Sequence, residues 1–141
     1  MAACVQRVSG VRMKKTRILV IDDEPSVVDA LKMILSDKGY EAASAVTARE
    51  ALELARRHPF DVAIIDLKLP DLSGLDLFRR IAEGCADTDG ILMTAYDSAE
   101  VRADAVSFGF AAVLPKPFSP RDLLDSLGGV LSQRRARSGA R

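Results

Sequence analysis

The feature that most constrains the fold is a regular alternation of two kinds of segment along most of the chain. Short aliphatic runs are typical of buried strands, because both faces of such a strand are covered. Each run is followed by a longer segment with apolar residues at helical spacing. The predicted strands are 18–21, 41–46, 61–67, 90–94 and 111–114. Five strand–helix units in succession predict an α/β fold, with a parallel sheet covered by helices on both faces.

The predicted helices begin and end at residues that commonly occur at helix termini. Pro25 and Ser26 open the first helix, and Gly39 ends it. Thr47 opens the second helix, with Glu50 in the position of a capping box. The other three helices are predicted over 75–82, from Ser98 to Gly109 and from Ser119 to Leu131.

The charge of the chain is balanced overall but unevenly spread. Its 141 residues, 48% hydrophobic and 28% charged, fit one ordinary globular domain. Residues 1–15 and 132–141 each hold four basic residues and no acid, which leaves 12 basic residues against all 20 acids in 16–131, a net charge of −8. An acidic body argues against direct nucleic-acid binding by this domain.

The sequence also favours a cytoplasmic protein. Aliphatic runs such as 18–21 and 62–65 are far shorter than the roughly 20 residues of a membrane-spanning helix. The first 15 residues lack the apolar stretch of a secretory signal. Two cysteines, Cys4 and Cys85, cannot form a disulfide framework or a metal cage, and we expect free thiols in a reducing compartment.

Polar side chains follow four of the five predicted strands. Asp22 and Asp23 follow the first strand, Asp66 ends the third, Thr94 ends the fourth, and Lys116 lies between two prolines after the fifth. In parallel sheets, ligands bind at the carboxyl ends of the strands, where the strand order reverses. We therefore expect three carboxylates, one hydroxyl and one ammonium group to meet at one edge of the sheet.

These side chains suit a divalent cation and a phosphoryl group. Three close carboxylates repel one another, so such a site either raises their pKa values or binds a cation. Oxygen ligands that leave room for water suit Mg²⁺. Lys116 and Thr94 suit a phosphoryl group, because one supplies a positive charge and the other a hydroxyl donor. Asp66 could attack phosphorus as an ionised nucleophile.

The same residues resemble the receiver domain of two-component response regulators, the CheY-like superfamily. The resemblance covers 16–132 and rests on four motifs in order, each at a strand end. The motifs are Asp22-Asp23, Asp66-Leu-Lys-Leu-Pro70 with Gly74, Thr94-Ala95 and Lys116-Pro117-Phe118. The resemblance implies a flavodoxin-like, doubly wound sheet of five parallel strands in order 2-1-3-4-5, with five helices. Around this domain we expect a disordered basic leader, 1–15, and a solvated basic tail, 133–141.

The resemblance also implies a role for each residue. Asp66 would accept a phosphoryl group from the phosphohistidine of a histidine kinase, with Thr94 and Lys116 completing the catalytic set. Asp22, Asp23, Asp66 and the backbone carbonyl of Lys68 would hold Mg²⁺. The domain would thus be a phospho-accepting signalling domain rather than an enzyme, catalysing only its own phosphorylation and autodephosphorylation.

Four positions are expected to control switching and access. Thr94 would shift on activation and change the face formed by the fourth helix, the fifth strand and the fifth helix. Val113 stands where the family usually has Tyr or Phe, so we expect the output face to respond less, or differently. Lys68 and Tyr96 lie at the mouth of the site in the family, and both are bulky enough to obstruct water and lengthen the phosphorylated state.

The resemblance implies partners and leaves two alternatives. The partners are a sensor histidine kinase or phosphotransfer protein and a downstream effector protein, without a membrane, and a homodimer could form through the output face. The alternatives are a phosphorylation-independent protein-interaction module with the receiver fold, or a receiver fragment of a DNA-binding transcription regulator.

Two enzyme classes are excluded. A haloacid-type phosphatase needs a second acid two residues after its nucleophile, where this chain has Lys68. A dinucleotide-binding enzyme needs a Gly-rich turn after the first strand. This chain has Asp22-Asp23-Glu-Pro there, which would repel a pyrophosphate.

Overall fold

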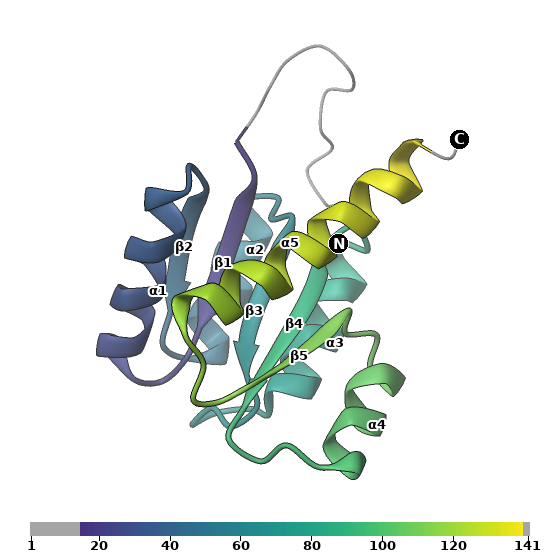
Figure 1. The fold of residues 1–141 in the computed structure, drawn as a ribbon. Coiled ribbons are helices and arrows are strands. Elements are labelled where there is room, and N and C mark those ends of the chain that lie inside the picture. The colour runs from purple at the N-terminus through teal and green to yellow at the C-terminus, as the bar shows by residue number, and fades with distance from the viewer. Residues whose placement is uncertain (1–14, 140–141) are drawn as a thin grey trace.

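A five-stranded parallel sheet forms the centre of the computed structural model, which describes residues 15–139 (Figure 1). The aliphatic runs become strands because each buries its apolar side chains between helices. The strands are β1 (Arg17–Ile21), β2 (Glu41–Ala45), β3 (Val62–Asp66), β4 (Asp89–Thr94) and β5 (Ala112–Pro115). Their order is β2-β1-β3-β4-β5, and every neighbouring pair is parallel. The predicted flavodoxin-like topology is therefore confirmed.

Five helices alternate with these strands and are capped largely as the sequence predicts. They are α1 (Pro25–Asp37), α2 (Ala48–Arg57), α3 (Gly74–Gly84), α4 (Ala99–Ser107) and α5 (Pro120–Gly139). Thr47 and Ser98 accept backbone N–H groups at the starts of α2 and α4. Gly39 ends the first strand–helix unit with a φ of 89°, in the left-handed region that glycine favours.

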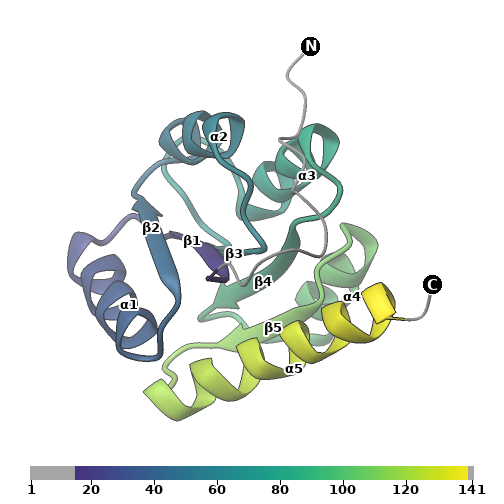
Figure 2. The same ribbon diagram turned by 90° about the horizontal axis from the view of Figure 1, so that it is seen from above.

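The helices form two layers, one on each face of the sheet (Figure 2). Alternate residues of each strand point to opposite faces. In β1, Ile18 and Val20 join the core beneath α1 and α5, whereas Leu19 and Ile21 join the core beneath α2, α3 and α4. Because both faces are covered, β1 and β3 are almost wholly buried, and the carboxyl ends of the strands are fixed in place.

The last helix continues beyond the predicted end at Leu131. It runs to Gly139, and the Gly128-Gly129 pair does not interrupt it. Arg134 pairs with Asp61 at 3.2 Å and with Asp89 at 2.9 Å, at the amino ends of β3 and β4. The expectation of a solvated tail is therefore wrong at Arg134, because two carboxylates at the opposite edge of the sheet bind its side chain.

The structure also bears on the expectations about membrane-spanning helices and free cysteines. Within 15–139, no helix combines the length and apolar character that crossing a bilayer requires. No cysteine in this range is free, so the expected free thiol at Cys85 is wrong. Cys4 and most of the expected 1–15 leader lie outside the described residues.

Candidate functional site

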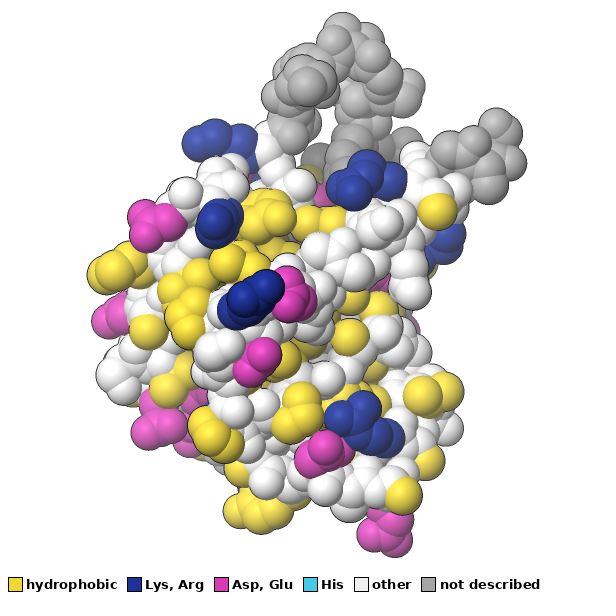
Figure 3. All heavy atoms as spheres, in the orientation of Figure 1, with side chains coloured by type: hydrophobic (Ala, Val, Ile, Leu, Met, Phe, Trp, Pro, Cys, Tyr) yellow, Lys and Arg dark blue, Asp and Glu magenta, His cyan; other side chains and the backbone are white. Residues whose placement is uncertain are grey.

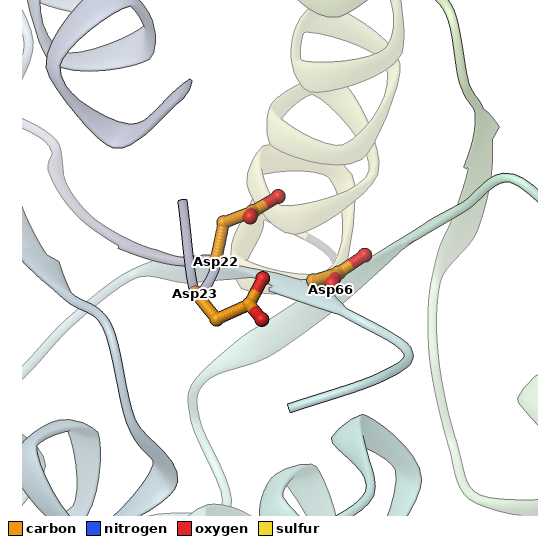
Figure 4. A group of neighbouring side chains, drawn as sticks. All are labelled: Asp22, Asp23 and Asp66. Atoms are coloured by element: carbon orange, nitrogen blue, oxygen red, sulfur yellow. The ribbon is translucent and has the colours of Figure 1, made fainter. Parts of the chain in front are cut away.

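Three aspartates gather at the carboxyl ends of β1 and β3 (Figure 4). Asp22 and Asp23 follow β1 directly, and Asp66 is the last residue of β3, the neighbouring strand. One carboxylate oxygen from each of the three lies within 4.8 Å of the other two. Asp22 and Asp66 are buried, whereas Asp23 is exposed. The cluster therefore has two fixed carboxylates and one that faces solvent.

Lys116 neutralises part of this charge. Its ammonium lies 2.7 Å from Oδ2 of Asp22 and 3.1 Å from Oδ1 of Asp66. It reaches the cluster because β5 ends at Pro115, and its own backbone N–H donates to the Thr94 carbonyl at 2.7 Å. One ammonium among three carboxylates leaves an excess of negative charge at this edge of the sheet.

Burial and the neighbouring charges change the pKa values of Asp66 and Lys116. Burial raises the pKa of the Asp66 carboxyl, the charge of Asp22 raises it further, and Lys116 counteracts both. Burial alone would lower the pKa of the Lys116 ammonium, but its bond to Asp22 and the charge of Asp66 outweigh burial and raise it. The site thus favours any cation that stabilises ionised carboxylates.

Thr94 lies at the end of β4, the strand next to β3. Its side chain is buried, and its Oγ1 accepts the backbone N–H of Tyr96 at 2.8 Å. This bond fixes the start of the β4–α4 loop. The hydroxyl keeps its proton available to donate, which a phosphoryl oxygen beside Asp66 could accept.

The loop after Asp66 turns back tightly through Gly74. The Gly74 N–H donates to the Leu67 carbonyl at 2.7 Å, and Lys68 pairs with Ser73 in an isolated antiparallel bridge. A Cβ on Gly74 would lie 2.2 Å from the backbone oxygen of Asp66. Only glycine fits there, so Gly74 keeps the backbone around Asp66 and Lys68 in its position.

Comparison with known protein families shows which family the chain belongs to. Residues 18–128 match the family described as response regulator receiver domain. The chain is a receiver domain of the two-component response regulators. The matched residues include all three aspartates, Thr94 and Lys116.

Relatives and solved structures agree with this assignment. The chain is similar to two transcriptional regulatory proteins of Mycobacterium tuberculosis. It is 34% identical to TrcR, over 82% of this chain and 45% of TrcR. It is 35% identical to KdpE, over 86% of this chain and 53% of KdpE. It thus spans about half the length of these relatives. A CheY-like receiver domain protein from Methanospirillum hungatei superposes with a TM-score of 0.83 at 33% identity, covering 88% and 99% of the two chains.

Two bulky side chains of the receiver, Lys68 and Tyr96, contact each other. Nζ of Lys68 lies 4.2 Å from the centroid of the Tyr96 ring. Lys68 belongs to the loop after β3 and Tyr96 to the loop after β4, so their contact joins the two loops that flank Asp66. Both residues are exposed.

Val113 is the position at which the resemblance to the receiver family predicts an aromatic residue. It lies in β5 opposite Leu92 of β4 and packs against the core beneath α2, α3 and α4. The nearby Phe110 is buried, with its ring centroid 4.5 Å from that of Phe78. Phe110 is thus held in the core and does not substitute for an aromatic side chain at position 113.

A mainly apolar hollow adjoins the carboxylate cluster. It measures about 550 Å³ and lies between α1 and the β5–α5 connection. Val27, Ile34 and Phe118 line it, and Lys116 forms part of its wall. Hydrophobic side chains are exposed on this face of the receiver (Figure 3).

Asp71 caps the start of α2, a contact that the sequence analysis did not predict. Its two carboxylate oxygens accept the backbone N–H groups of Ala48 and Arg49, at 2.9 and 3.0 Å. These bonds cap α2 from the β3–α3 loop, and the bond to Ala48 is the main reason why the pKa of Asp71 is lowered. The signal in the sequence was an acid in the loop after Asp66, but nothing local pointed to α2.

Proposed function

We propose that Asp66 accepts a phosphoryl group from the phosphohistidine of a partner protein, in a reaction that depends on Mg²⁺. The observation that carries this proposal is the convergence of Asp22, Asp23 and Asp66 with the Lys116 ammonium at one edge of the sheet. An Asp66 oxygen forms a bond to phosphorus, the phosphorus–nitrogen bond breaks, and its electron pair stays on the imidazole. The receiver therefore catalyses only its own phosphorylation and autodephosphorylation.

The donor set fits a hard divalent cation. Every side-chain ligand is a carboxylate oxygen, and the oxygens lie within 4.8 Å of one another. We propose that Asp22, Asp23, Asp66 and the Lys68 backbone carbonyl hold Mg²⁺, with Asp23 open to the solvent that supplies the remaining ligands. When bound, Mg²⁺ would neutralise charge on the phosphoryl oxygens.

Lys116 and Thr94 hold the phosphoryl group. The Lys116 ammonium already contacts Asp66, so it lies within reach of an oxygen on a phosphoryl group bound there. The Thr94 hydroxyl donates to another oxygen. Forming that bond can draw Thr94 away from the Tyr96 N–H that it accepts now, which links phosphorylation to the β4–α4 loop.

The phosphoryl donor needs a surface from which phosphohistidine reaches Asp66. The apolar hollow between α1 and the β5–α5 connection adjoins Lys116, and we propose that a sensor histidine kinase or a phosphotransfer protein docks there. Exposed apolar side chains at the edge of a polar site are typical of protein-binding surfaces.

The response is carried by α4, β5 and α5 to a downstream effector protein, or to a second copy of the receiver through the same face. Because TrcR and KdpE are transcriptional regulatory proteins, we propose an output in gene regulation. We propose that the receiver spans 16–132, with a basic segment, 1–15, before it and a basic segment, 133–141, after it, of which Arg134 belongs to α5 and binds the domain. The cytoplasmic location stays a prediction.

A magnesium titration tests the metal part of this proposal. Amide resonances around Asp66 should shift in a saturable way as Mg²⁺ is added to the full chain. Asp23→Asn should weaken binding about tenfold, because it removes one charged ligand. Asp37→Asn, an exposed aspartate at the end of α1, serves as the matched control. Unchanged affinity in Asp23→Asn would overturn the metal assignment.

Incubation with acetyl phosphate then distinguishes a receiver that accepts a phosphoryl group from an interaction module that signals by binding alone. A receiver that accepts phosphorus gains the mass of one phosphoryl group when Mg²⁺ is present and gains none when EDTA removes the cation. An interaction module that signals by binding alone gains no mass under either condition.

A further inference from the structure

A second hollow of the receiver is lined by residues of α2, α3 and the loop before α3. The helices α2 and α3 belong to the layer opposite α1 and α5 (Figure 2). The hollow measures about 470 Å³, within the range of sites for small molecules. Arg49 and Arg56 line it from α2, and Arg80 lines it from α3. Leu52 and Leu72 supply an apolar part of its wall.

The three arginines are exposed and form no ion pair with any residue that the structure describes. Over residues 15–139, the ion pairs of arginine involve Arg17, Arg79, Arg102, Arg121, Arg134 and Arg137. None involves Arg49, Arg56 or Arg80, although 16–131 carry a net charge of −8. Three guanidinium groups around one hollow are therefore open to an anion.

The acidic residues of the hollow cancel this charge only in part, because three arginines face the two carboxylates of Asp71 and Glu53 and the lining keeps a net charge of +1. Both carboxylate oxygens of Asp71 already accept the backbone N–H groups of Ala48 and Arg49. Glu53 is the other acid in the lining, and its exposed side chain makes no ion pair with the described residues. The backbone N–H groups at the start of α2 already donate to Asp71, so an anion in the hollow would bind to the arginine side chains.

We propose that this hollow binds a small ligand that carries a diphosphate group. Guanidinium groups on two helices can grip two phosphoryl groups through paired N–H donors. Leu52 and Leu72 can contact an apolar part of the ligand, such as a nucleotide base. The site belongs to the other helical layer from the docking hollow and does not depend on phosphorylation of Asp66.

Titration of the full chain with inorganic pyrophosphate, in buffer without Mg²⁺, tests the proposal by amide resonances. Saturable shifts are expected in α2 and α3. Arg56→Gln and Arg80→Gln should each weaken binding about tenfold, because each removes charge-assisted hydrogen bonds. Glu53→Gln should strengthen binding, because it removes a repelling charge. Arg57→Gln is the matched control: Arg57 is exposed at the end of α2 and does not line the hollow.

A parallel titration with ADP distinguishes the source of the diphosphate. Tighter binding of ADP than of pyrophosphate, with the same dependence on Arg56 and Arg80, indicates a nucleotide; equal binding indicates the diphosphate alone. Each result supports the site. The proposal is overturned by shifts that do not saturate, by equal weakening in Arg57→Gln, or by shifts centred on Asp66 that persist in the arginine variants. Circular dichroism of every variant checks that the fold is kept.

Discussion

Nζ of Lys116 lies 2.7 Å from Oδ2 of Asp22, a carboxylate with no exposed surface. The contact joins the end of β5 to the end of β1, across 94 positions of the sequence. It therefore holds the two sides of the carboxylate cluster together.

Lys116→Met should destabilise the receiver by about 2 kcal/mol, because it leaves a buried carboxylate without its cation. The loss should be largest without Mg²⁺ and should shrink as Mg²⁺ is added, since the ion replaces the missing positive charge. Urea unfolding with and without Mg²⁺ measures both effects. Lys38→Met, at the exposed end of α1, is the control, and equal destabilisation of the two variants would contradict the account.

Lys68 and Tyr96 should lengthen the life of the phosphorylated state. Lys68→Ala and Tyr96→Ala should each speed autodephosphorylation about two- to fivefold, as expected for loss of an exposed cation–π contact that obstructs water. The double variant should be no faster than the faster single variant, because each change already breaks the same contact. Mass spectrometry of the decaying phosphoprotein gives the rates. Unchanged rates in both single variants would refute this role.

Val113 should limit how far the signal spreads. A valine is too short to move between a buried and an exposed position as an aromatic side chain can, and Phe110 is held against Phe78. With beryllofluoride as a phosphate mimic, amide shifts at Val113 and Leu114 should be smaller than those around Asp66. Val113→Tyr should enlarge the shifts in β5. Shifts at Val113 in the unaltered receiver as large as those at Asp66 would argue against this account.

Arg134 should stabilise the edge of the sheet opposite the carboxylate cluster. Its side chain is only 16% exposed and pairs with Asp61 and Asp89. Arg134→Ala should therefore lower the free energy of unfolding by about 1–2 kcal/mol. Arg135→Ala, its exposed neighbour without an ion pair among the described residues, should change it by less than about 0.5 kcal/mol. Equal urea midpoints for the two variants would show that the Arg134 contacts contribute nothing.

The sheet and its polar edge could be predicted because both follow from local patterns. Aliphatic runs identified the strands, and parallel pairing then placed Asp22 and Asp66, which end neighbouring strands, side by side. The contacts of Asp71 and Arg134 could not be predicted in this way. Asp71 caps a helix that lies 22 positions earlier, and Arg134 reaches a carboxylate 45 positions away.

A weak signal for Arg134 was nevertheless present. Asp61 directly precedes β3 and Asp89 starts β4, so a parallel sheet brings them to one edge, and the basic end of the last helix runs toward that edge. Recognising the pairing required the length of α5, and the apolar residues at helical spacing that predict this helix end at Leu131. Burial of Leu123, Leu127 and Val130 against the sheet stabilises α5 despite the two glycines.

The most direct test of the central claim is the mass of the receiver after incubation with acetyl phosphate and Mg²⁺. The unaltered chain should gain one phosphoryl group, and Asp66→Asn should gain none. Asp71→Asn, which changes an aspartate of the loop that follows β3, should still gain one. A phosphoryl group that appears equally in Asp66→Asn, or in none of the three proteins, would contradict phosphorylation at Asp66.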